Sequence, residues 1–270
     1  MNHKKFSSRL DQQDLQDLQD LAALALDAAK QAGMDQAEVM FTKSSGINVI
    51  ARLGDIENIE YMNDCGMSIT VYKENKKGNA STSDLSKNAL KETVQKASTF
   101  AKYTVADEYA GLADKHLLDQ DPVDLDLAHN WDIDTYSAIE LAISCEDAAR
   151  NYDKRIVNSE GATVSTIYGS YVYGNTNGFM SGYNKTRHSL SCVVLGEHEG
   201  KKERDHWYTV SRNPDALETP RSVGLRAAKN TIGRLGGCKI KTCNAPVLFS
   251  SEVAGAFIGH SISALTGRSQ

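Results

Sequence analysis

The run from Ile156 to Arg212 constrains the fold more than any other part of the chain, because apolar and polar residues alternate along it. Alternation with a period of two places every second side chain on one face of a strand. The run is rich in Tyr, Thr, Ser and Val, which favour strands, and Asn-Gly and Glu-Gly pairs supply turns. We therefore predict a meander of antiparallel strands here.

Helical patterns lie on both sides of this meander. Before it, apolar residues recur at helical spacing between residues 134 and 153. After it, Thr219 and Pro220 suit the first turn of a second helix, which Gly236 and Gly237 would end. Together these patterns predict a unit in which two helices flank an antiparallel sheet.

The N-terminal part of the chain repeats the same order of elements. Leucine and alanine recur at helical spacing from Leu15 to Gln31, and Gly33 follows as a stop. Alternating segments then predict several antiparallel strands, with a turn at residues 75–78. A second helical stripe begins after Ser86, a favourable N-cap. The predicted fold class is therefore α+β, with two modules of antiparallel sheet and flanking helices.

Changes of composition predict four parts along the chain. They are an N-terminal α+β domain (1–105), an acidic linker (106–134), a central α+β domain with the β-meander (135–238) and the beginning of a C-terminal β-rich domain (239–270). The last part opens with a strand pattern at residues 245–251 and continues as an apolar helix of small residues. This part would be the start of a third unit, of which the sequence contains only residues 239–270.

The linker invites a calcium hypothesis, because several aspartates gather in it: Asp119, Asp121, Asp124 and Asp126. An EF-hand loop also needs a Gly at its sharp turn and a bidentate Glu at its end. Neither falls at the required place. A solvated linker without calcium is the prediction.

Composition excludes several classes of partner. The chain has 270 residues, a formal net charge of -5 and 24% charged residues. No basic face is implied, which argues against nucleic acid. No apolar run approaches the roughly 20 residues of a membrane helix, and the N-terminus lacks the apolar core of a secretion signal. We expect a cytoplasmic protein that binds no membrane, with its five cysteines as free thiols.

Motifs for catalysis are weak. His198 and Glu199 resemble the start of a zinc-binding His-Glu-x-x-His helix, but Lys202 stands where the second His is needed. His188 and Cys192 lie four residues apart in a strand-like run and so share one face. No third group can be named to orient them as a hydrolase site. The residues alone predict no active site on this chain.

Three segments carry a resemblance to a known family. They are "GSYVYGNTNGFMSGYNKTRHSLSCVVLGE", "PRSVGLRAAKNTIGRLGG" and the ending "APVLFSSEVAGAFIGHSISALTGRSQ". With the order of elements, they resemble the PmbA (TldE) branch of the TldD/PmbA metalloprotease family. The resemblance runs from about Leu15 to the last residue.

The resemblance implies a cytosolic metalloprotease system of two homologous subunits, a heterodimer. In that family the TldD-type subunit carries a His-Glu-x-x-x-His helix that binds zinc, and the PmbA-type subunit lacks it and completes a closed chamber. The family is associated with proteolytic maturation of peptide precursors by removal of leader peptides, and with degradation of small unfolded polypeptides. The implied partners are a TldD-type homologous subunit and a peptide substrate.

The segment "GAFIGH" aligns with such a zinc helix in a degenerate form. Gly255 falls at the first His, Ala256 at the Glu and His260 at the last His. One imidazole is too few ligands for a protein zinc site, and without the Glu no base activates the water. We therefore predict that this chain carries no catalytic residue, metal or cofactor, that zinc is bound by the TldD-type partner, and that the chain alone is inactive.

Two alternatives stay open. The chain could be a stand-alone peptide-binding module that holds an extended peptide by strand addition to an aromatic-rich meander, with Tyr168, Tyr171, Tyr173, Phe179 and Tyr183. In an ordinary sheet these aromatic residues would instead alternate between core and surface. The chain could also be an inactive fragment, because family members continue into a C-terminal domain of which only the opening stands here.

Overall fold

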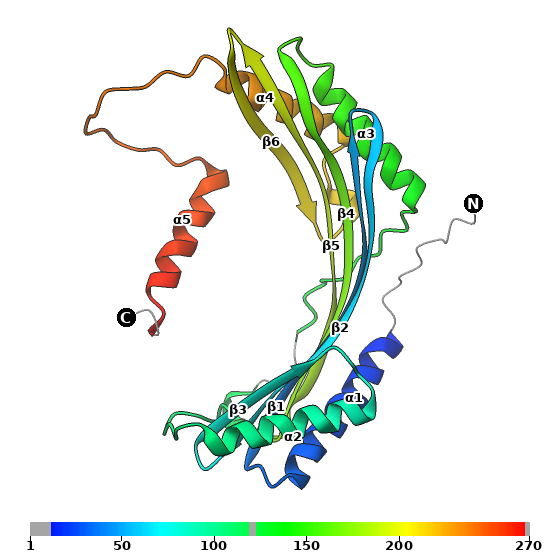
Figure 1. Cartoon of the computed structure of the whole chain (residues 1–270), viewed down its shortest axis with the longest axis vertical. Helices are drawn as coiled ribbons and strands as arrows, with labels where there is room; N and C mark the ends of the chain where they lie inside the picture. The colour runs from blue at the N-terminus through cyan, green and yellow to red at the C-terminus, as the bar shows by residue number, and fades with distance from the viewer. Residues whose placement is uncertain (1–11, 119–122, 268–270) are drawn as a thin grey trace. The chain divides into compact units, whose positions relative to one another are not determined.

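A computed structural model describes residues 12–118 and 123–267 and divides after Leu235 into two units. Figure 1 shows the elements in chain order. The first unit contains α1 (Gln12–Gln31), β1 (Gln36–Arg52), β2 (Asp55–Lys73), β3 (Lys76–Thr82), α2 (Lys87–Tyr103), α3 (Thr135–Arg150), β4 (Ile156–Asn175), β5 (Met180–His198), β6 (Lys201–Ser211) and α4 (Pro220–Arg234), with short 3-10 turns at Lys115–Leu117 and Pro214–Ala216. The second unit contains α5 (Ser251–Ala264). The predicted α+β class is confirmed.

The strands form one curled antiparallel sheet in the order β3-β2-β1-β4-β5-β6 (Figure 1). The sheets of the two predicted modules therefore meet along β1 and β4, which pair from Glu38↔Asn175 to Ala51↔Ala162. The predicted meander is confirmed as β4, β5 and β6. The division of this unit into domains at residues 105 and 135 stays a prediction.

The two halves of the sheet repeat one pattern of antiparallel pairing. β1, β2 and β3 pair antiparallel in chain order, and β4, β5 and β6 do the same. The order of strands is mirrored about the β1–β4 pair. The repetition of helix, strands and helix that the sequence predicts is thus also a repetition of strand pairing.

All four helices of this unit pack on one face of the sheet, which we call the helix face. Odd-numbered residues of β1 face these helices: Val39 and Phe41 are buried beneath α1 and α2, and Ile47 and Val49 are buried beneath α3 and α4. Lys43, between these two groups, is exposed. Alternation then places even-numbered residues of β1 and β2, and odd-numbered residues of β4 and β5, on the other face. We call this second surface the open face, because none of α1–α4 packs on it.

Helix and turn signals are confirmed at several positions. The Ser86 and Thr219 hydroxyls accept hydrogen bonds from the backbone N–H groups of Ala89 and Ser222, so both are N-caps. The turn predicted at residues 75–78 lies earlier, because Glu74 and its successor take the positive φ angles between β2 and β3.

Part of the predicted linker contacts the sheet. Residues 127–131 dock on the helix face between the two helix pairs. The backbone N–H of Thr186 donates to the Leu127 carbonyl at 2.9 Å, and the N–H of His129 donates to the Thr186 hydroxyl at 3.0 Å. These bonds hold the chain against β5, and a solvated linker would leave that part of the sheet uncovered. Of the four linker aspartates, Asp124 and Asp126 are exposed, and the other two lie outside the described residues.

The strand predicted at residues 245–251 is wrong. Within residues 236–250 the structure contains no strand, and α5 begins at Ser251. A strand needs a neighbouring ladder for its backbone groups, and residues 236–267 supply none. None of the described helices is long and apolar enough to cross a membrane.

Candidate functional site

The degenerate zinc positions lie on α5. Gly255, Ala256 and His260 are all exposed, and a Cβ atom added at Gly255 would meet no other atom within 4 Å. His260 offers one imidazole, and the other two positions offer no ligand atom. Among the residues that the structure describes, no group of three His, Cys, Asp or Glu side chains could hold a metal ion. The donor set of α5 therefore does not fit zinc.

His188 and Cys192 do share the helix face, as the sequence predicts, but they do not form a catalytic pair. The His188 ring is fully buried; its Nδ1 lies 2.7 Å from the Thr166 hydroxyl and its Nε2 lies 2.8 Å from the His129 carbonyl oxygen. A carbonyl only accepts, so Nε2 carries the proton and the Thr166 hydroxyl donates to Nδ1. His188 is a neutral residue that pins the connecting segment to β4 and β5.

The thiol of Cys192 lies in the core beside another thiol. Cys145 of α3 and Cys192 of β5 are both fully buried. A hydrogen bond with the Cys192 thiol, together with burial, raises the pKa of Cys145 well above its usual range. A thiol with a raised pKa forms little thiolate at neutral pH and is a poor nucleophile. The Cys192 thiol is itself fully buried, so a substrate cannot reach it, and the hydrolase hypothesis based on Cys192 has no support in this geometry.

Burial of His188 predicts a pH dependence of stability. Burial lowers the pKa of His188 below its ordinary value of 6.5. As pH falls below about 6.5, the unfolded chain takes up a proton at this site before the folded chain does, so the free energy of unfolding falls. The fall stops once pH is below the folded pKa. Urea titrations at pH 7.5 and 5.5 should show a loss of about 1 kcal/mol that the His188→Asn variant lacks. Equal losses in both proteins would contradict this prediction.

The His198–Glu199 motif lies in the turn between β5 and β6. Both side chains are at least half exposed, and Glu199 takes a positive φ of 51°. Lys202, at the position of the missing second His, lies 3.5 Å from Glu197 in an exposed ion pair. The prediction of a charged turn in place of a zinc helix is confirmed.

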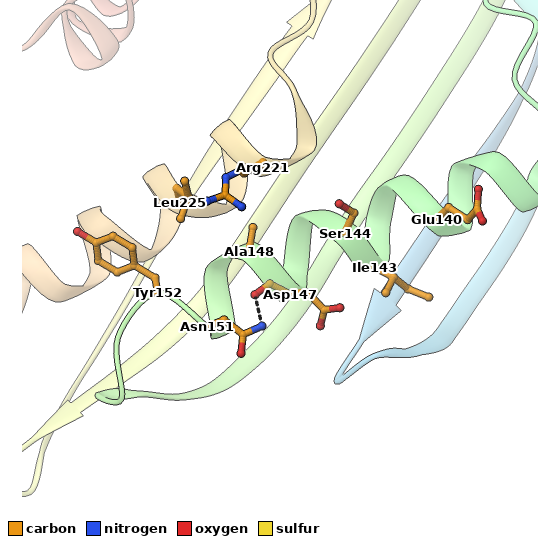
Figure 2. A pocket seen from close by; sticks show the side chains of 9 residues that line it. All are labelled: Glu140, Ile143, Ser144, Asp147, Ala148, Asn151, Tyr152, Arg221 and Leu225. Carbon is orange, nitrogen blue, oxygen red and sulfur yellow. Dashed lines mark hydrogen bonds between the residues drawn. The ribbon is translucent and has the colours of Figure 1, made fainter.

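A groove of about 580 Å³ runs between α3 and α4 on the side away from the sheet. Figure 2 shows Arg221 and Leu225 of α4 facing α3, with Asp147 and Tyr152 on the other wall. Asn151 donates to the backbone carbonyl of Asp147 at 2.9 Å. No cysteine or histidine lines the groove, so it offers neither a nucleophile with a base nor a metal site.

The aromatic residues of the meander alternate between the faces of the sheet, as in an ordinary sheet. Tyr168 is buried on the helix face, where its hydroxyl donates to the Trp131 carbonyl at 2.6 Å. Tyr171 and Tyr183 are cross-strand neighbours on the open face, with stacked rings 5.3 Å apart. Only part of the predicted aromatic set could therefore meet one ligand.

The edge strands are partly blocked against strand addition. The backbone N–H of His206 in β6 donates to the Asp205 carboxylate at 2.8 Å, and the His206 carbonyl accepts from Asn230 of α4 at 3.2 Å. In β3, the Lys77 carbonyl accepts from the Thr104 hydroxyl at 2.9 Å. An added strand would have to displace these side chains. Edge pairing is therefore a poor route for peptide binding, and the open face is the better candidate surface.

Comparison with known proteins now defines the class. Residues 37–101 match the family model "PmbA/TldA metallopeptidase domain 1", and residues 128–235 match "PmbA/TldA metallopeptidase central domain". The chain belongs to the PmbA/TldD metallopeptidase family.

Within this family the chain is similar to PmbA proteins. Metalloprotease PmbA of Escherichia coli O157:H7 is 46% identical over 235 residues, which are 87% of this chain and 52% of that protein. The Metalloprotease PmbA homolog of Haemophilus influenzae is 46% identical over 245 residues, or 91% of this chain and 54% of the homolog. The chain thus spans about half the length of the curated relatives it matches.

Solved structures share the fold. A protein assigned as a modulator of DNA gyrase from Bacteroides thetaiotaomicron superposes with a TM-score of 0.77 at 22% identity, covering 83% of this chain and 52% of that chain. TldE from Thermococcus kodakarensis superposes with a TM-score of 0.64 at 14% identity, covering 78% of this chain and 47% of that chain. At these identities the likeness supports the fold alone.

Proposed function

We propose that this chain belongs to the subunit without zinc of a two-subunit cytoplasmic metallopeptidase, in which a TldD-type homologue binds the zinc ion. The observation that carries the proposal is the donor set of α5. Its aligned positions supply His260 alone, with Gly255 and Ala256 in place of a ligand and a base. Membership of a metallopeptidase family together with an incompetent zinc helix calls for a second subunit that supplies the metal.

The proposed substrates are peptides. The complex would remove leader peptides from ribosomally made precursors and degrade small unfolded polypeptides. The side chains of this chain would hold or enclose the peptide, and bond cleavage would take place at the zinc of the partner. When bound there, zinc supplies an activated water and polarises the scissile carbonyl.

Reconstitution with a TldD-type subunit from the same genome tests the proposal. Neither subunit alone should cleave a precursor peptide, and the mixture should do so with zinc retained on the TldD-type subunit. Replacement of the zinc-ligating histidines of that subunit should abolish cleavage, whereas His260→Ala of this chain should leave zinc content and cleavage unchanged. Stoichiometric zinc on the isolated chain that is lost in His260→Ala would refute the proposed division of roles.

A further inference from the structure

The open face carries charges of opposite sign on different strands. Glu60 and Asp64 lie on β2, and Lys185 and Arg187 lie on β5, all on the open face by strand register. Glu60, Asp64 and Arg187 are exposed and Lys185 is half-buried. Within residues 12–118 and 123–267, none of the four belongs to an ion pair. These charges are therefore available to a ligand.

One row across the sheet joins an acid to a base. Asp64 pairs with Ser44 of β1, Ser44 pairs with Gly169 of β4, and Gly169 pairs with Lys185 of β5. Side chains in such a row stand side by side on one face. The row thus has a carboxylate at one end, an ammonium group at the other and small residues between them.

The basic end of the row rests on an aromatic platform. A Cβ atom added at Gly169 would lie 2.8 Å from the Tyr171 ring, so this ring covers the glycine. Lys185 Nζ lies 4.0 Å from the centre of the Tyr171 ring. The Tyr183 ring stacks on the Tyr171 ring, with 5.3 Å between the two ring centres. The contact between cation and ring holds the ammonium group in place without neutralising its charge.

The length of the row selects an extended ligand. Neighbouring strands lie about 4.8 Å apart, so the three intervals from Asp64 to Lys185 span about 14 Å. An extended chain advances about 3.4 Å per residue, so about four residues cover this span. A peptide laid across the strands would therefore match the row with a basic and an acidic residue four positions apart.

We infer that the open face binds extended peptides, with Asp64 holding a Lys or Arg of the peptide and Lys185 holding an Asp or Glu four positions away. Glu60 and Arg187 extend the acidic and the basic ends of the surface. As a statement about substrate class, the inference rests on the proposed function. As a statement about binding, it concerns this chain alone and needs neither zinc nor a partner.

An NMR titration tests the binding. The probe is a capped, unstructured nine-residue Gly/Ser peptide with one Tyr, one Lys and one Glu, the charges four positions apart. Its control has the same composition with Lys and Glu adjacent. We expect amide shifts on β1, β2, β4 and β5, at least threefold weaker binding of the control, and loss of most binding in 1 M salt, because exposed ion pairs are screened there.

Substitutions make the test specific. Asp64→Asn and Lys185→Gln should each weaken binding roughly two- to fivefold, as expected for an exposed charge pair. The exchanged double variant Asp64→Lys/Lys185→Asp should bind more tightly than either single charge reversal, because the peptide can lie in the opposite direction. It should bind less tightly than the natural chain, because Glu60 and Arg187 keep their charges and the contact between cation and Tyr171 is lost. Asp20→Asn on α1 and Lys91→Gln on α2 remove the same charges from exposed helix positions and should change nothing.

Several results would overturn the inference. They are shifts on the helix face, equal binding of the two peptides, or equal effects of open-face and helix variants. Sedimentation experiments test whether the chain self-associates. If Asp64→Asn abolishes self-association and the peptide competes with it, the open face binds a second copy of the chain. If the peptide does not bind, the proposal that zinc is held by the TldD-type subunit still stands. That proposal is tested separately, by metal content and cleavage in the reconstituted complex.

Discussion

Replacing Gly224 with Ala is expected to lower the free energy of unfolding by about 3 kcal/mol, as overpacking against a rigid neighbour does. Gly224 lies where α4 crosses α3, and a Cβ atom there would lie 2.1 Å from the Cys145 carbonyl oxygen. It would also lie 3.1 Å from the Ala148 Cβ and the Ala149 nitrogen. Backbone cannot rotate out of the way as a flexible side chain can, so the two helices must separate.

The same helix supplies a matched control. Gly233 is also in α4, and a Cβ atom there would meet nothing within 4 Å. Ala favours a helix over Gly by about 1 kcal/mol, so Gly233→Ala should stabilise the chain slightly. Urea unfolding followed by circular dichroism measures both variants. Opposite signs are expected, and a stabilised Gly224→Ala protein would show that the helix crossing is not close packed.

Local signals in the sequence predict the elements of this fold well, and long-range pairing is what they miss. Thr219 caps α4 through the N–H of Ser222, and Gly33 ends α1 with a positive φ, because these choices depend on a few neighbouring residues. The pairing of β1 with β4 joins residues more than a hundred positions apart, and alternation in each strand is compatible with many partners.

The same distinction explains the site. The degenerate zinc segment can be found from the sequence because its positions lie within six consecutive residues. Its lack of zinc ligands also follows from the sequence, because it depends only on the residue types at these positions. The row from Asp64 to Lys185 could not be found, because it exists only through the registers of three strand pairs. Sequence patterns do not predict the docking of residues 127–131 either. Thr186 and His188, which hold them, look like ordinary strand residues when read one at a time.

Replacing Glu146 with Ala is expected to lower the free energy of unfolding by about 3 kcal/mol, since it removes the acceptor of two part-buried backbone N–H groups and leaves a cavity in the core. Glu146 is fully buried on α3, and its two carboxylate oxygens accept from the N–H of Leu53 at 2.8 Å and the N–H of Gly54 at 3.0 Å. Both hydrogen bonds are to the turn between β1 and β2, in which Leu53 has a φ of 55° and Gly54 a φ of 84°. The carboxylate thus ties α3 to a hairpin of the other half of the chain.

Glu146→Gln distinguishes this tie from simple loss of packing. The amide keeps the size of the side chain but turns one acceptor into a donor, which faces a backbone N–H. We expect it to lose about 2 kcal/mol, whereas Glu140→Gln, exposed on the same helix, should change stability by less than about 0.5 kcal/mol. Hydrogen exchange should quicken at the amides of Leu53 and Gly54 in Glu146→Gln before it does in the rest of the sheet. Unchanged protection of these two amides would mean that the turn holds its conformation without the carboxylate, and that the loss in Glu146→Ala comes from the cavity alone.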